Sequence, residues 1–245
     1  MRKLTLVPVL VLVAALGLVT SPAHADGGTY PSNAPVLSSG QTVSGGATTT
    51  QSCGNGDAGK AGVQYYRIPL AFGDTLVADF TNVTGYGTYL GVLAPDVTDY
   101  TVSNAQTLAS ASTPSSQKAE LKYVAPAAGS YLLVITCRSS GTSWAYSLAV
   151  NVLHSTTVSA SGPTGVKVGH KVKVTGQASV AGTVTLQLKS GGWKDVAKAA
   201  TKADGTFKLK YKPAATGRLK LRVVFAGPPG YLGSLSSKIK VQVHR

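Results

Sequence analysis

The chain has 245 residues, of which 23 are lysine or arginine and nine are acidic, so its formal net charge is +14 at pH 7. So few acidic residues argue against paired-carboxylate hydrolysis, because two of them would have to share one cleft. Nowhere are aspartates dense enough to predict a calcium site, and we expect the isolated Asp96 and Asp99 to be solvated turn residues.

The first 25 residues have the pattern of a secretory signal peptide. Arg2 and Lys3 precede an apolar run that ends at Val19, and residues 21–25 (SPAHA) supply a cleavage site with small residues. This run is shorter than the roughly 20 residues that a membrane span needs, and no second run of spanning length follows it. The sequence predicts cleavage after Ala25 and a mature chain that has no transmembrane segment. We expect it to be secreted, either extracellular or loosely associated with the cell wall.

The mature chain divides into two halves that differ in charge. Residues 26–154 contain five lysines and arginines against seven acidic residues, a net of −2, whereas residues 155–245 contain sixteen against two, a net of +14. A chain of this length suits two ordinary β domains. We therefore predict one domain over residues 26–153 and a second, basic domain over residues 154–245.

Both cysteines, Cys53 and Cys137, lie in the first half. In an exported chain such a pair predicts a disulfide. It would close a loop of 85 residues, counted from the sequence, and the chain-entropy model gives roughly 4–5 kcal/mol for a loop of that size. A redox or metal pair is the alternative, but neither cysteine has a histidine or a second cysteine at ligand spacing.

The first half alternates apolar and polar residues as strands do. Residues 66–70 and 76–80 alternate on either side of a turn-like Ala71–Asp74, which predicts a β-hairpin. Residues 89–93 and 131–135 are apolar on both faces, which is typical of the central strands of a sandwich.

The two ends of this half carry different patterns. Residues 26–46 predict a weakly ordered lead-in or an edge strand, whereas residues 146–150 alternate apolar and polar residues as a closing strand. Together with Gln64–Leu70, Leu76–Phe80 and Ala125–Val134, that closing strand resembles the bacterial pre-peptidase C-terminal (PPC) domain over residues 33–152. The resemblance implies a jelly-roll-like, non-catalytic β-sandwich of the kind that accompanies secreted peptidases. It raises the hypothesis of an accessory or inhibitory partner of a separately encoded secreted enzyme.

In the second half, apolar residues alternate with cations. Val172 and Val174 follow Lys171 and Lys173, and residues 207–212, 218–223 and 238–243 repeat the pattern. Successive side chains of a strand point to opposite faces, so one face is predicted to be core and the other a row of cations. The predicted anion-binding residues are Lys167, Lys171, Lys173, Lys208, Lys210, Lys212, Arg218, Lys220, Arg222, Lys238 and Lys240.

About seven strands in this half, separated by glycine-rich turns such as residues 203–205, have the size and rhythm of an immunoglobulin-like sandwich. Residues 158–176, 184–197 and 204–223 resemble the bacterial Ig-like repeats of surface and secreted proteins. Such repeats act as spacers, adhesive modules or polymer binders, so the resemblance implies a fold more than a function. The fold class predicted for the whole chain is all-β, with two β-sandwich domains.

No catalytic motif is present: there is no HExxH, no GxSxG and no phosphate-binding loop. We expect a non-enzymatic protein without cofactor or metal. The charge of the second half favours an anionic cell-wall polymer or polysaccharide as partner, bound by multivalent electrostatics. The alternative interpretation of the outward lysines is solubility and protection of sheet edges.

Two other kinds of partner are weighed against the anionic polymer. A carbohydrate-binding site in the first half would use Tyr86, Tyr100 and Trp144 as stacking platforms, although Trp144 also fits a core position. Sequence-specific nucleic-acid binding is disfavoured, because the aromatic residues of the second half, Trp193 among them, are interpreted as core.

Overall fold

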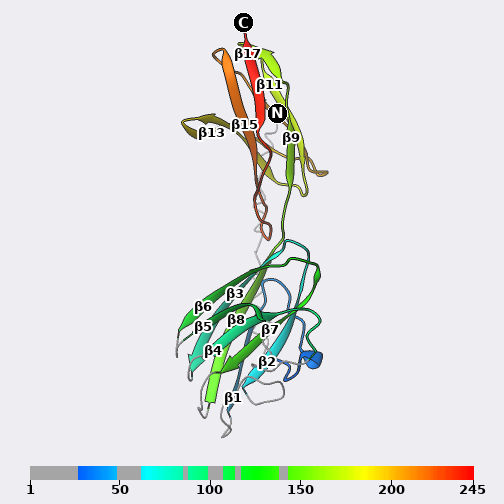
Figure 1. Ribbon diagram of the computed structural model, residues 1–245, viewed down its shortest axis with the longest axis vertical. Coiled ribbons are helices and arrows are strands. Elements are labelled where there is room, and N and C mark those ends of the chain that lie inside the picture. Colours follow the sequence, from blue (N-terminus) through cyan, green and yellow to red (C-terminus); the bar gives the residue numbers. More distant parts are fainter. Residues whose placement is uncertain (1–26, 49–61, 85–87, 99–106, 114–116, 138–142) are drawn as a thin grey trace, which may run out of the picture.

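The computed structural model describes residues 27–48, 62–84, 88–98, 107–113, 117–137 and 143–245. In these ranges the protein is all-β, and its sheets form two sandwiches that lie end to end along the longest axis (Figure 1). The N-terminal sandwich contains β1 to β8 and the C-terminal sandwich contains β9 to β17. The predicted signal peptide and its cleavage site lie outside the described residues.

Two four-stranded antiparallel sheets form the N-terminal sandwich, and the only helical element described is the short 3-10 helix η1 (Pro31–Asn33). One sheet has the order β1 (Thr42–Thr48), β8 (Ser143–Leu153), β3 (Thr75–Thr84) and β6 (Lys118–Val124). The other has the order β2 (Val63–Leu70), β7 (Gly129–Cys137), β4 (Thr88–Leu93) and β5 (Thr107–Thr113). Their facing sides bury one core that includes Ile68, Leu76, Phe80, Leu90, Leu133, Tyr146 and Leu148. Cys53 lies outside the described residues, so the disulfide with Cys137 stays a prediction.

The two runs predicted to be central strands are confirmed, because β4 and β7 occupy the inner positions of their sheet. Their outer face is also covered. The segment before β1 runs beside β2, where Gly28 pairs with Tyr65 and Val36 with Arg67. A second small core forms there from Ala34, Val63, Tyr65, Leu93, Leu132 and Val134. The predicted edge strand is also present, since β1 lies at the edge of its sheet.

The hairpin predicted for residues 66–80 is wrong, although both of its strands exist. β2 pairs with β7, whereas β3 pairs with β6 and β8, so the two strands belong to opposite sheets. The turn between them is tight: the backbone N–H of Ala71 donates to the Asp74 carboxylate at 2.9 Å, and Gly73 has a φ of 78°. Gly73 N–H also donates to the carbonyl of Ala125. The turn therefore carries the chain from one sheet to the other across the core.

The C-terminal sandwich packs a three-stranded sheet on a larger one. The first has the order β14 (Thr206–Tyr211), β11 (Val172–Ala178) and β9 (Val158–Ser161). The second has the order β10 (Gly165–Lys167), β17 (Ile239–His244), β15 (Gly217–Ala226), β12 (Thr183–Ser190) and β13 (Gly192–Ala200), with β16 (Ser234–Leu235) also paired to β15. Between the sheets lies a core that includes Val172, Val174, Val184, Leu186, Phe207, Leu221, Val223, Phe225 and Val241. The predicted alternation of buried apolar residues and exposed cations is confirmed on β11, β14 and β17.

The two sandwiches meet directly after β8. The backbone N–H of His154 donates to the carbonyl of Gly230, and the N–H of Leu232 donates to the carbonyl of His154, both at 2.9 Å. On the other side, His154 Nδ1 lies 3.1 Å from the buried carboxylate of Asp74. One residue thus contacts a turn of each sandwich.

Candidate anion-binding site

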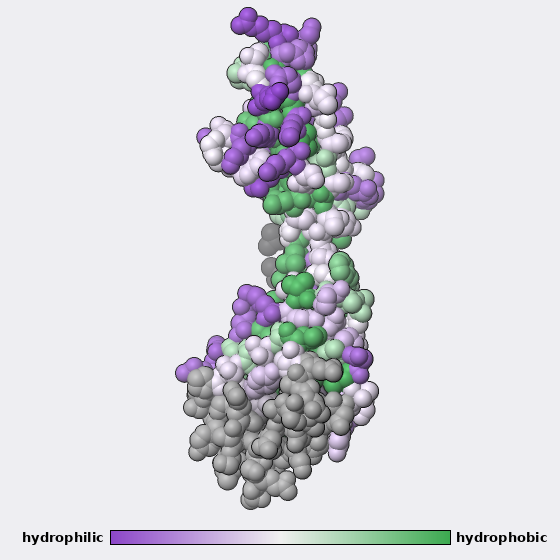
Figure 2. Space-filling model, viewed as in Figure 1, coloured by the Kyte–Doolittle hydropathy of each residue, from purple (hydrophilic) through white to green (hydrophobic). Residues whose placement is uncertain are grey.

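The eleven predicted cations are distributed over two opposite surfaces of the C-terminal sandwich. Those in or next to β11 and β14 form one surface, here the β11–β14 face: Lys171, Lys173, Lys208, Lys210 and Lys212. Those in or next to β10, β15 and β17 form the other, here the β15–β17 face: Lys167, Arg218, Lys220, Arg222, Lys238 and Lys240. The two sheets share one core, so their outward side chains point in opposite directions. Figure 2 shows hydrophilic side chains gathered on the visible side of this sandwich.

Each face contains a pair of lysines in direct cross-strand register. Lys173 lies opposite Lys210, and Lys220 lies opposite Lys240. The Cβ atoms of such partners are about 4.5–5.5 Å apart, and like charges at that position destabilise a sheet. Among the described residues the only salt-bridge contacts are Lys122–Glu120 and His154–Asp74, so none of the eleven cations pairs with a carboxylate in that part of the chain.

The two acidic residues of this sandwich have other partners. Asp195 accepts a hydrogen bond from the side-chain amide of Gln187 at 2.8 Å. Asp204 accepts from both the hydroxyl and the backbone N–H of Thr206, and these hydrogen bonds, the one from the hydroxyl first, hold the pKa of its carboxyl below the usual value. Neither carboxylate offsets the charge of the lysine pairs, so both faces are strongly positive.

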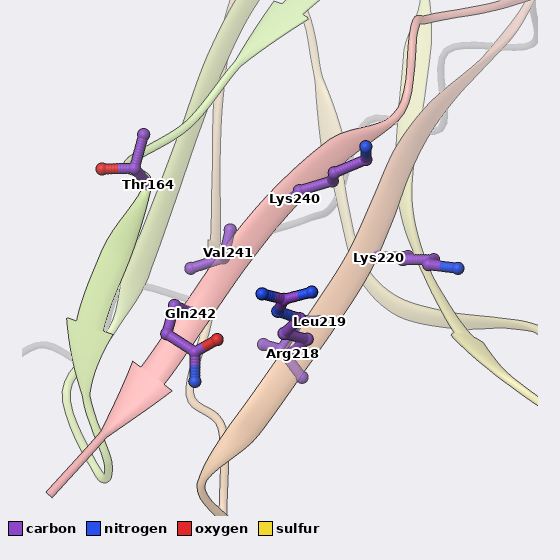
Figure 3. A pocket seen from close by; sticks show the side chains of 7 residues that line it. All are labelled: Thr164, Arg218, Leu219, Lys220, Lys240, Val241 and Gln242. Atoms are coloured by element: carbon purple, nitrogen blue, oxygen red, sulfur yellow. The ribbon is translucent and has the colours of Figure 1, made fainter.

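A groove of about 660 Å³ lies on the β15–β17 face (Figure 3). Arg218 lies opposite Gln242 and Lys220 opposite Lys240, so three cations and one amide face outward from two adjacent strands. Figure 3 shows Arg218 and Gln242 beside one another between β15 and β17. The lining residues are Thr164, Arg218, Leu219, Lys220, Lys240, Val241 and Gln242.

One end of the groove lies next to the short strand β10. This strand pairs with β17 only from Gln242 to His244, and within residues 143–245 no strand pairs with the free edge of β17 before that point. Thr164 lies at the start of β10, where its carbonyl accepts a hydrogen bond from the backbone N–H of Gln242 at 2.7 Å. The groove therefore offers guanidinium, ammonium, amide and hydroxyl donors, a set that suits carboxylate, sulfate or phosphate oxygens.

Arg222 lies further along β15, two residues beyond Lys220, and its side chain is held in place by its neighbours. Its Nε donates to the side-chain oxygen of Gln187 at 2.8 Å, and its Cζ lies 4.1 Å from the centre of the Trp193 ring. The Nζ of Lys189 lies 5.7 Å from that ring. The interpretation of Trp193 as core is wrong, because its ring is only partly buried and packs with the cations of the outer face.

Sequence reasoning found Arg218, Lys220 and Lys240 but missed the two uncharged polar residues of the groove, Thr164 and Gln242. A signal for Gln242 was present, since it shares its parity with Lys238 and Lys240 along β17. Thr164 precedes a three-residue strand, and only the parallel pairing of β10 with β17 brings it there.

The predicted aromatic site in the first half is not supported. Trp144 is only 4% exposed and stacks on Tyr146 with 5.1 Å between ring centres, so the prediction that it binds glycans is wrong. It lies in the core because the facing sheet covers that side of β8. Tyr86, Tyr100 and Asp99 lie outside the described residues, whereas Asp96 is exposed next to β4.

Within the described residues, no three or more histidine, cysteine, aspartate or glutamate side chains gather in a way that could hold a metal ion. In the same residues no helix is long and apolar enough to cross a membrane.

Comparison with known proteins gives structural likeness alone. No family model and no curated protein matches the chain. Among solved structures, the pre-peptidase C-terminal domain of a collagenase from Bacillus anthracis is similar at 17% identity and a TM-score of 0.34, over 48% of this chain and 93% of that one. A β-1,2-glucanase from Parabacteroides distasonis is similar at 7% identity and a TM-score of 0.28, over 75% of this chain and 30% of that one. Likenesses this distant carry no argument about function, and the PPC and Ig-like resemblances stay predictions.

Proposed function

We propose that this protein is an exported, non-catalytic binding protein whose C-terminal sandwich attaches to an anionic polymer outside the cell, a cell-wall polymer or an acidic polysaccharide. One observation carries the proposal: Arg218, Lys220 and Lys240 line one groove, and no acidic side chain of the sandwich pairs with them. An external polyanion would supply the missing negative charge.

Strand geometry makes this face suitable for a polymer. Outward residues on one strand repeat every second position, about 6.6–6.8 Å apart, and neighbouring strands are about 4.8 Å apart. Arg218, Lys220 and Arg222 therefore form a regular row along β15, with Lys240 beside it on β17. A chain that bears a charge on each repeating unit contacts several of these cations at once, so weak contacts add up to useful affinity.

Edge protection explains the groove poorly. Lysines that prevent sheet-to-sheet aggregation belong on edge strands, whose backbone groups are unpaired. Lys240 lies beside the free edge of β17, but Arg218 and Lys220 lie on β15, which is paired on both sides by β17 and β12. Lys220 therefore covers no edge, and placing it against Lys240 opposes folding.

The test is retention of the mature chain on immobilised polygalacturonate and on purified cell wall across a salt series. Lys220→Gln/Lys240→Gln removes two groove charges, and Lys118→Gln/Lys122→Gln removes two from the N-terminal sandwich as a matched control. We expect wild type and control to bind, with retention falling steeply above physiological salt, where charges are screened over about 8 Å. The groove variant should lose at least tenfold in affinity. Equal retention of the two double variants, or binding indifferent to salt, would overturn the proposal.

A further inference from the structure

The β11–β14 face is also positively charged, but it lies on the opposite sheet from the groove. All five of its lysines are exposed. Lys173 faces Lys210 across the two strands, and Thr175 faces Lys208, so a hydroxyl lies beside the ammonium groups. No ion pair of the described residues involves any of these lysines. This face is thus a second array of unneutralised donors.

Edge protection accounts for only part of this array. β14 is an edge strand, and Lys208 and Lys210 fit that role. β11 is the middle strand of its sheet, but β9 pairs with it only from Thr175 to Ala178, so the stretch with Lys173 is paired with β14 alone. Edge protection needs one lysine there, and a second one directly opposite, Lys210, raises the local positive potential at the expense of the strand pairing.

The two faces are separate binding surfaces. Two packed sheets lie about 10 Å apart, and the outward side chains add to that distance on each side. The separation exceeds the screening length of about 8 Å at physiological salt, so an anion on one face hardly weakens the attraction of the other. A stiff polymer chain that follows the strands of one face does not reach the second.

We propose that the C-terminal sandwich is bivalent: the β15–β17 face holds one anionic chain, the β11–β14 face holds another, and the protein bridges polymer chains without covalent chemistry. This inference rests on the proposed function and adds the β11–β14 face as a second, weaker site, because its cations are all lysines and it has no counterpart of Arg218 to bind a carboxylate with two hydrogen bonds. Bridging has a characteristic dose dependence, because excess protein saturates each chain separately and removes the cross-links.

The experiment captures a second chain on protein that already holds a first. Mature protein is bound to immobilised polygalacturonate, unbound protein is washed away, and fluorescent polygalacturonate is added. The variants are Lys173→Gln/Lys210→Gln on the β11–β14 face, Lys220→Gln/Lys240→Gln on the other face, and Lys118→Gln/Lys122→Gln as control. Urea unfolding confirms that each variant is folded.

We expect wild type and control to capture the fluorescent chain, and the Lys173→Gln/Lys210→Gln variant to bind the immobilised chain while its capture, per bound protein, falls at least tenfold. Mixtures with soluble polymer should scatter light most at an intermediate protein ratio and clear with excess protein. Normal capture by that variant, as a protein dimer would give, overturns bivalence and leaves the groove proposal intact. Wild type that fails to bind the immobilised chain overturns both.

Discussion

Exchanging Lys220 for glutamate should strengthen the fold and weaken binding at once. Lys220 faces Lys240 in register on adjacent antiparallel strands, and both side chains are exposed. The substitution replaces a like-charge pair by an opposite-charge pair. The repulsion that is removed and the attraction that is gained each amount to roughly 0.2–0.5 kcal/mol for exposed pairs, so together we expect a gain in unfolding free energy of about 0.5–1 kcal/mol. For a sandwich of this size, that gain raises Tm by roughly 2–8 °C.

Tryptophan fluorescence can follow the unfolding of each sandwich separately, because the chain has only two tryptophans, one in each sandwich. In a Trp144→Phe background, the fluorescence of Trp193 reports urea unfolding of the C-terminal sandwich alone. The stabilisation should shrink between about 0.05 and 0.5 M salt, because salt screens exposed pairs. Retention on polygalacturonate should fall together with the rise in stability. The Lys220→Glu/Lys240→Glu variant should lose the added stability, since two carboxylates then face each other.

Two outcomes would refute this prediction. If Lys220→Glu leaves retention on the polymer unchanged, the pair is not part of a binding surface. If the variant is no more stable than wild type at low salt, the two lysines do not repel each other across the strands, and the reasoning from register is refuted.

The remaining predictions concern the N-terminal sandwich. Tyr146→Phe should lower the free energy of unfolding by about 1–3 kcal/mol, because the Tyr66 hydroxyl, 2.6 Å from that of Tyr146, loses a buried partner. Trp144 fluorescence during urea unfolding measures this loss, and an unchanged midpoint would contradict the prediction. Burial of its hydroxyl, together with the neighbouring Tyr131 hydroxyl, raises the pKa of Tyr123 to about 12 from 10.0. The stability that the protonated Tyr123 hydroxyl contributes is therefore complete below pH 10 and is lost as the pH rises to 12. Over this range the denaturant midpoint of Tyr123→Phe should fall less than that of wild type. Equal slopes for the two proteins would count against this prediction. Asp74→Ala removes the buried acceptor of the Ala71 N–H and should cost about 1–3 kcal/mol by thermal unfolding, with the exposed Asp96→Ala as a neutral control.

The sequence by itself determined which residues alternate and hence which side chains share a face. Val172 and Val174 are buried and Lys171 and Lys173 exposed because side chains of any strand point to alternate sides, a local property of the backbone. The same rule placed Lys220 and Lys240 outward. Continuous apolar runs identified β4 and β7 as inner strands, since only strands covered on both faces bury every residue.

Only the tertiary structure decided which strands pair and what covers each face. The turn at Ala71–Asp74 joins opposite sheets because β2 and β3 each pair with distant strands, an arrangement that short-range alternation does not encode. For the same reason, the sequence did not decide which of the two tryptophans, Trp144 and Trp193, is buried in a core. A facing sheet buries Trp144, whereas Trp193 packs with Arg222 on an outer face. The division of one lysine pattern into two opposite faces likewise follows from packing, because β11 and β15 belong to different sheets over a common core.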